Sequence, residues 1–157
     1  MGQARTIGTR IVTAAVLLAV ALAPDTHAAG TTPAACTRAD FEAVVDSAAE
    51  ALRTLTQKNS PAFQAKLREL KDKRGWSNEQ FMAQGTRFVQ DDRIAEFEDK
   101  SGNLLARING TASDAGPEKA IDCSQLPPLK ANMAALVEIQ TAKWTYMFTN
   151  IETELAK

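Results

Sequence analysis

The sequence predicts an all-α fold, a small bundle of about five helices in which one disulfide ties the first helix to the long C-terminal helix. Three observations support this fold class. Beyond residue 37, apolar residues recur at intervals of three and four, which is the period of a helix. Pairs of capping residues precede several of these stretches. No segment alternates apolar and polar residues for long enough to predict a strand.

The first 28 residues have the pattern of a secretory signal peptide. Arg5 and Arg10 precede an uncharged stretch over residues 11–24, and small residues follow it up to Ala28. The apolar stretch is shorter than the ~20 residues that a membrane span needs, so a retained anchor is the weaker alternative. We expect cleavage after Ala28, a single helical domain over residues 29–157, a periplasmic or secreted location, and no stable membrane span after cleavage.

The first part of the domain predicts two helices. Thr37 and Asp40 have the spacing of a capping box and begin an apolar stripe that runs to Leu55. Ser60 followed by Pro61 is typical of a second helix start, because proline is favoured at the first helical position. Gly75 would end this second helix.

Three further helices follow in the sequence. Ser77 and Gln80 form another capping-box pattern. The apolar phase slips near residues 90–93, which predicts two helices over residues 77–109, with one long bent helix as the alternative. The dipeptide at 109–110 is expected to end the second of them. After a long connection over residues 110–127, Pro127 and Pro128 begin a last helix of roughly 28 residues, ~42 Å in length.

Cys36 and Cys123 are expected to form a disulfide, since an exported chain meets an oxidising compartment; two free thiols are the alternative. Cys36 precedes the first helix and Cys123 precedes the last. A bond between them would place two helix N-termini together, so these helices should run parallel. An up-down chain then needs an odd number of helices, either five or a three-helix core with two short helices packed on it.

Composition excludes several function classes. The net charge of -1 gives no basic excess for nucleic-acid binding. The only histidine, His27, would leave with the signal peptide, which removes Ser-His and Cys-His catalysis, His-ligated zinc and a His-ligated haem. The sequence also lacks a P-loop and a dinucleotide-binding glycine motif. We therefore expect no enzyme and no cofactor.

Charged clusters supply the candidate ion and surface sites. Asp92 and Glu96, at helical spacing within the acidic stretch over residues 91–99, are the candidate ligands for a hard cation such as calcium. A solvated acidic face is the favoured interpretation of the same residues. The basic stretch over residues 66–74 is expected to pair with the acidic stretch over residues 91–99 or to solvate the surface, with anionic lipid or an acidic partner as the alternative.

Aromatic residues supply the candidate interaction sites. Trp76 could anchor a partner or fold back into the core. Trp144 and Phe148 share one face of the last helix and are expected in the core, whereas Tyr146 is expected to point away from it. Ile139, Lys143 and Tyr146 would then form a small exposed strip that contacts a partner or a second copy.

These features favour binding over catalysis. We expect a module that acts through protein–protein contacts, such as an adaptor, a chaperone or an immunity-type protein, with another cell-envelope protein as its partner. The alternative is a binder of a small apolar molecule or lipid, with Trp76, Trp144 or Phe148 lining a cavity between helices. An enzyme that uses carboxylates alone is the third and least favoured hypothesis.

Overall fold

A computed structural model of the chain describes residues 36–114 and 121–157, and in both segments the structure is helical. It contains helices α1 (Arg38–Arg74), α2 (Asn78–Gly85), α3 (Asp92–Asp114) and α4 (Leu126–Leu155), with single 3-10 turns at Thr86–Phe88 and Cys123–Gln125. No strand occurs in these two segments, so the all-α prediction is confirmed. The predicted signal peptide lies outside the described residues.

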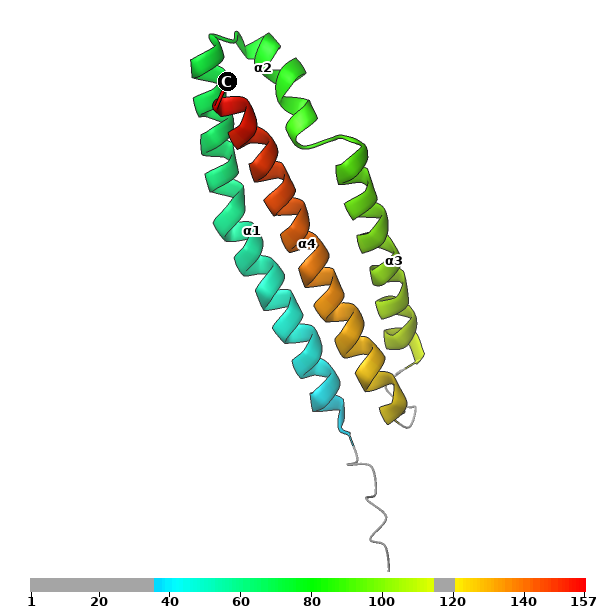
Figure 1. Cartoon of the computed structure of the whole chain (residues 1–157). Coiled ribbons are helices and arrows are strands. Elements are labelled where there is room, and N and C mark those ends of the chain that lie inside the picture. Colours follow the sequence, from blue (N-terminus) through cyan, green and yellow to red (C-terminus); the bar gives the residue numbers. More distant parts are fainter. Residues whose placement is uncertain (1–35, 115–120) are drawn as a thin grey trace, which may run out of the picture. The chain divides into compact units, whose positions relative to one another are not determined.

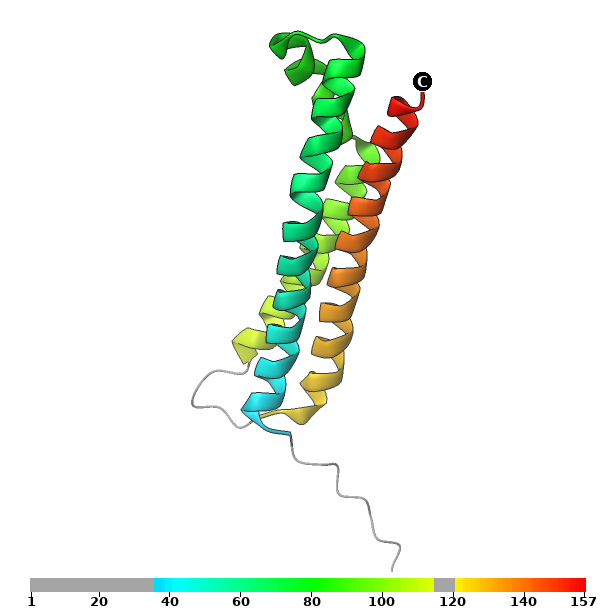
Figure 2. The same ribbon diagram turned by 90° about the vertical axis from the view of Figure 1, so that its left-hand side faces the viewer.

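Helix α4 is the centre of the bundle. It lies between α1 and α3 and contacts both along their length, whereas α1 and α3 contact each other little (Figure 1). Helices α1 and α4 run in the same direction and α3 runs in the opposite one, as Figures 1 and 2 show. The described helices therefore form a three-helix core with one short helix, α2, beside it, where the expected layout has two short helices.

The disulfide explains why α1 and α4 start at the same end. Cys36 and Cys123 are bonded, with sulfur atoms 2.11 Å apart and Cα atoms 5.5 Å apart. The backbone N–H of Cys36 also donates to the Cys123 Sγ atom at 3.0 Å. The predicted pairing and the predicted parallel direction of the first and last helices are both confirmed.

The predicted break at Ser60 and Pro61 is wrong, because α1 is one continuous helix of 37 residues with Pro61 inside it. Proline removes the N–H that would bond the carbonyl of Gln57, at a typical cost of about 3 kcal/mol. Gln57 is exposed, so water can reach that carbonyl. The apolar stripe also continues in phase from Ala48 through Phe63 to Leu70, and its burial against α4 offsets the lost bond.

The predicted helix starts are confirmed by their hydrogen bonds. The N–H of Thr37 donates to the Asp40 carboxylate at 2.6 Å, and the N–H of Asp40 donates to the Thr37 hydroxyl at 3.3 Å. Ser77 and Gln80 form the same reciprocal pair before α2, at 2.9 and 3.2 Å. The start of α4 is also confirmed, with prolines in its first turn.

The glycines behave differently at the ends of α1 and α3. Gly75 has a left-handed backbone (φ 62°), and the N–H of Trp76 donates to the Lys71 carbonyl at 3.0 Å, which closes a Schellman motif. Gly110 was expected to end α3, but the helix continues to Asp114. Ile108 is buried two residues before Gly110, and this packing offsets the cost of about 1 kcal/mol for a helical glycine.

The region over residues 77–109 contains two α-helices, α2 and the first part of α3, as the slip in apolar phase predicts. Helix α2 contributes no buried residue. It is attached to α1 through Lys71, whose ammonium group donates to Asn78 at 2.6 Å and lies 5.7 Å from the centre of the Phe81 ring. Helix α3 starts afresh because Asp91 caps it, accepting the N–H of Ile94 at 2.7 Å.

The core divides into two apolar clusters along the bundle. The first cluster, near the disulfide, consists of Ala48, Leu104, Ile108, Leu129, Met133 and Leu136. The second cluster, near the end of α4, consists of Phe63, Leu70, Phe88, Ile94, Met147 and Ile151.

A polar contact lies between the two clusters. Ser101 is 4% exposed, and its hydroxyl donates to the carbonyl of Phe97 at 2.8 Å and accepts from the side-chain amide of Gln140 at 2.8 Å. Ser101 precedes the first-cluster residues of α3, and Gln140 separates the two clusters along α4. This contact joins α3 to α4 at mid-length and satisfies the buried Ser101 hydroxyl.

Candidate functional site

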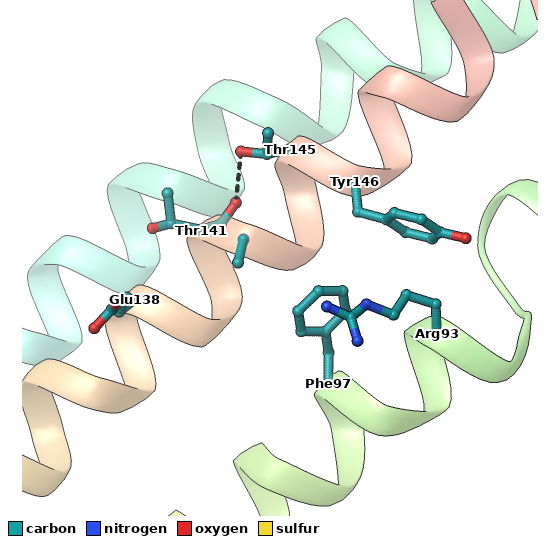
Figure 3. Close-up of a pocket in the computed structure, with 7 residues that line it drawn as sticks. Arg93, Phe97, Glu138, Thr141, Thr145 and Tyr146 are labelled. Atoms are coloured by element: carbon teal, nitrogen blue, oxygen red, sulfur yellow. Dashed lines mark hydrogen bonds between the residues drawn. The ribbon is translucent and has the colours of Figure 1, made fainter. Parts of the chain in front are cut away.

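The structure describes an open groove of about 530 Å³ between α3 and α4. Helix α3 contributes two residues to it and α4 contributes five (Figure 3). The lining residues are Arg93, Phe97, Glu138, Thr141, Ala142, Thr145 and Tyr146. The side chain of Phe97 is buried and that of Tyr146 is half-buried, whereas the other five are exposed. The groove therefore combines an aromatic floor with an accessible rim.

The capping residue of α3 also holds the floor of the groove. The hydroxyl of Tyr146 donates to one carboxylate oxygen of Asp91 at 2.8 Å, while the other oxygen accepts the N–H of Ile94. This places the Tyr146 ring beside that of Phe97, with the ring centres 6.1 Å apart and a tilt of 54°. One carboxylate thus starts α3 and orients the aromatic residue that α4 presents to the groove.

Arg93 provides a cation at the Tyr146 end of the groove. Its guanidinium lies 5.0 Å from the centre of the Phe97 ring and donates to Glu96 at 2.5 Å. The side chains of Arg93 and Glu96 are 52% and 54% exposed, so water screens this ion pair and the pair contributes little stability. Because a guanidinium has five N–H donors, Arg93 can bind a second carboxylate without releasing Glu96.

The threonine hydroxyls on the α4 side of the groove need no hydrogen-bond acceptor from a molecule that packs against it. The hydroxyls of Thr141 and Thr145 donate to carbonyls one turn earlier in α4, at 2.8 and 3.0 Å, and Figure 3 shows the second of these bonds. Thr149 and Thr153 repeat the same bond towards the C-terminus. With the threonine donors satisfied and Ala142 between them, this face presents small side chains to which another helix can approach closely.

Glu138 is at the opposite end of the groove from Arg93, as Figure 3 shows. No described residue forms an ion pair or hydrogen bond with its carboxylate. Eight residues of α4 separate Glu138 from Tyr146, which corresponds to ~12 Å along the helix axis. The groove therefore has one accessible negative group near one end and one accessible positive group, the Arg93 guanidinium beside the Phe97 ring, further along it.

The structure places the candidate cation ligands on an open helix face. Glu96 pairs with Arg93, and Asp92 is exposed in the first turn of α3. Within residues 36–114 and 121–157, no group of three or more acidic, histidine or cysteine side chains gathers in a way that could hold a metal ion. Other acidic residues in this stretch have structural partners, since Asp91 caps α3 and Glu98 accepts from Lys143 at 2.5 Å.

The expected exposed strip on the last helix is not exposed. Tyr146 packs against the second apolar cluster, and Ile139 packs against the first. The side chain of Lys143 is only 17% exposed and pairs with Glu98. The prediction that Tyr146 points away from the core is wrong, because α4 lies between two neighbours and this flank faces α3. Of the predicted strip, only Tyr146 lines the groove.

Large aromatic residues pack together elsewhere in the bundle. Trp76 is half-buried against the second cluster. Trp144 and Phe148 contact the Phe63 ring edge-on, with ring centres 6.1 and 5.5 Å apart. The predicted core position of Trp144 and Phe148 is confirmed. A ligand-binding cavity would instead need these three residues to line a void.

The basic stretch of α1 ties the C-terminal end of α4 to the bundle. Lys66 pairs with Glu152 at 3.0 Å, and Lys73 donates to the backbone carbonyl of Leu155. Arg74 and Arg87 both contact the Glu154 carboxylate, at 3.4 and 3.3 Å. These acidic partners belong to α4 and not to the acidic stretch of α3.

Glu154 also accepts a hydrogen bond from Lys157, and this bond, with the charges of Lys157, Arg87 and Arg74, lowers the pKa of its carboxyl below the usual value. The cations also face the carbonyl end of α4, where positive charge is favourable.

Sequence reasoning missed Arg93, Phe97 and Glu138 as members of one site. They come from two helices, and only the packing of α3 on α4 brings them together.

The helices of the described segments include none that is long and apolar enough to cross a membrane. No protein-family model, curated protein or solved structure matches this chain.

Proposed function

We propose that this chain is an exported interaction module and that the groove between α3 and α4 receives a helix of a protein partner in the cell envelope. The observation that carries this proposal is the combination of an aromatic floor, a rim of small side chains and two accessible opposite charges. A helix laid in a groove is a recurring mode of protein recognition, in which apolar residues on one face act as anchors.

The dimensions favour a helix as the occupant. The groove runs along α4, and its two charges lie at different points along it. A complementary helix would carry a basic residue opposite Glu138, an acidic residue further along the same face within reach of Arg93, and an apolar residue over Phe97 and Tyr146. The small side chains of Thr141, Ala142 and Thr145 allow such a helix to approach to about 8 Å, the short end of normal interhelical distances.

Two features support export. Residues 1–28 have the pattern of a signal peptide, and the described chain contains a disulfide. The disulfide and the lack of a membrane span in the described helices are compatible with an exported protein. We propose the periplasm or the extracellular space as the working compartment.

The test uses site-specific photocrosslinking in the intact exported chain. A photoreactive phenylalanine analogue at Ala142 should give a covalent product with a second polypeptide, because Ala142 lies in the groove between the two charges. The same analogue at Ala43, an exposed position on α1, is the matched control and should give no such product. Glu138→Lys should reduce the crosslink at Ala142. Equal products at both positions, or none at Ala142, would show that the groove is not a docking site.

A further inference from the structure

We infer that the occupant of the groove is α4 of a second copy of this chain, packed antiparallel about a two-fold axis near Ala142. This inference rests on the proposed docking function of the groove and names the partner. Its basis is that the groove is self-complementary in charge and in side-chain size.

The charge argument follows from symmetry. When two copies of α4 run antiparallel about Ala142, the residue four positions before it faces the residue four positions after it in the other copy. Glu138 therefore lies opposite Tyr146 of the second copy. Arg93 is at the Tyr146 end of the groove, because Asp91, two residues earlier, holds the Tyr146 hydroxyl. The Arg93 guanidinium, which lies 5.0 Å from the centre of the Phe97 ring, can extend from there to the Glu138 carboxylate of the other copy, so that two equivalent ion pairs form.

A parallel pairing of two copies of α4 would bring like charges together. It would bring Glu138 towards Glu138 and Arg93 towards Arg93, and juxtaposed like charges disfavour association. A two-fold axis also uses the same patch on both copies, which is the usual geometry of homodimers. The unpartnered Glu138 and the exposed Arg93 thus select the antiparallel arrangement and a closed dimer.

The side-chain sizes on α4 match across the same axis. In this register Ala131 faces Thr153, and Ala135 faces Thr149 of the other copy. The hydroxyls of Thr149 and Thr153 already donate within α4, so an alanine opposite them leaves no donor unsatisfied. Each α4 would lie in the groove that α3 and α4 of the other copy form, giving a four-helix arrangement at the interface.

The test measures the mass of the disulfide-bonded chain in solution across a concentration series, by sedimentation equilibrium or light scattering. We expect a dimer whose dissociation constant rises by roughly tenfold or more in Glu138→Lys and in Arg93→Glu, since each places like charges at both symmetric contacts. The double variant Glu138→Lys/Arg93→Glu should restore dimerisation. Glu42→Lys, on an exposed position of α1, is the control and should behave as the wild type. Circular dichroism verifies that each variant is folded.

Two results would overturn this inference. One is a wild-type chain that is monomeric at about 100 µM, which would place any self-association in the weak range. The other is a dimer that the single variants leave unchanged or that the double variant fails to restore. The crosslink at Ala142 separates this failure from that of the proposed function. A product with a different polypeptide keeps the docking function and removes the second copy, whereas no product removes both.

Discussion

Removing the disulfide is the most quantitative test of the fold. The perturbation is the double variant Cys36→Ser/Cys123→Ser, which avoids leaving a reactive thiol. The bond closes a loop with a sequence separation of 87 residues. The chain-entropy model gives a stabilisation of about 4.6 kcal/mol for a loop of that length at 25 °C, which is an upper bound because residual structure in the unfolded chain reduces it. We expect the variant to lose about 2–4 kcal/mol of unfolding free energy.

The assay is urea-induced unfolding followed by circular dichroism, with and without a reductant. The wild type in reductant should unfold at the same urea concentration as the double variant, and reductant should have no effect on the variant itself. A loss of less than about 1 kcal/mol would refute the reasoning, because the unfolded chain would then gain little freedom when the bond is removed. Retained helical signal before unfolding distinguishes a less stable fold from an unfolded one.

Three further predictions concern stability. Leu70→Ala should cost about 2–5 kcal/mol in urea unfolding because Leu70 is fully buried, whereas Leu105→Ala, at a position 46% exposed, should cost under about 1 kcal/mol; equal losses would contradict the assigned core. Pro61→Ala should raise the thermal midpoint by restoring a helical N–H inside α1, a gain of about 1–3 kcal/mol less the entropy that proline removes from the unfolded chain; a lower midpoint would mean that the helix is interrupted there. Hydrogen bonds from the Thr37 backbone and hydroxyl lower the pKa of Asp40, and bonds from the Ser124 hydroxyl and backbone lower that of Asp122. A carboxyl whose pKa is lowered in the folded state stabilises the fold at a pH above its unfolded pKa of about 3.9, and this contribution disappears as the pH falls through the folded pKa. Asp40→Asn should therefore flatten the fall of the thermal midpoint below about pH 4. An unchanged pH profile would exclude this carboxyl as a source of acid sensitivity.

The sequence predicted those elements whose causes are local. Capping boxes depend on side chains three positions apart, and the two that were predicted, at Thr37 and Ser77, have the expected hydrogen bonds. The disulfide followed from two cysteines and an export pattern. Its position before the first and last helices was sufficient to predict their parallel direction, because a covalent bond between two helix starts restricts the topology.

The errors arose where packing outweighs a local signal. Pro61 and Gly110 are unfavourable inside helices, yet both helices continue through them. In α1 the apolar stripe keeps its phase across Pro61, and this continuity was the signal that favoured one helix. Apolar periodicity identifies the centre of a buried helix face, and it therefore predicts that Tyr146 points away from the core. A helix between two neighbours also buries its flanks, and Tyr146 lies on such a flank.

Stability and recognition can be separated in this chain because different contacts support them. The disulfide joins α1 to α4 at one end of the bundle. The groove instead depends on contacts between α3 and α4, namely the bond from Tyr146 to Asp91 and the ion pair of Lys143 with Glu98. A chain without the disulfide but still folded should therefore keep its groove and its partner. A charge reversal at Glu138 should weaken association without lowering the unfolding free energy of the monomer, since that carboxylate has no partner within the described chain.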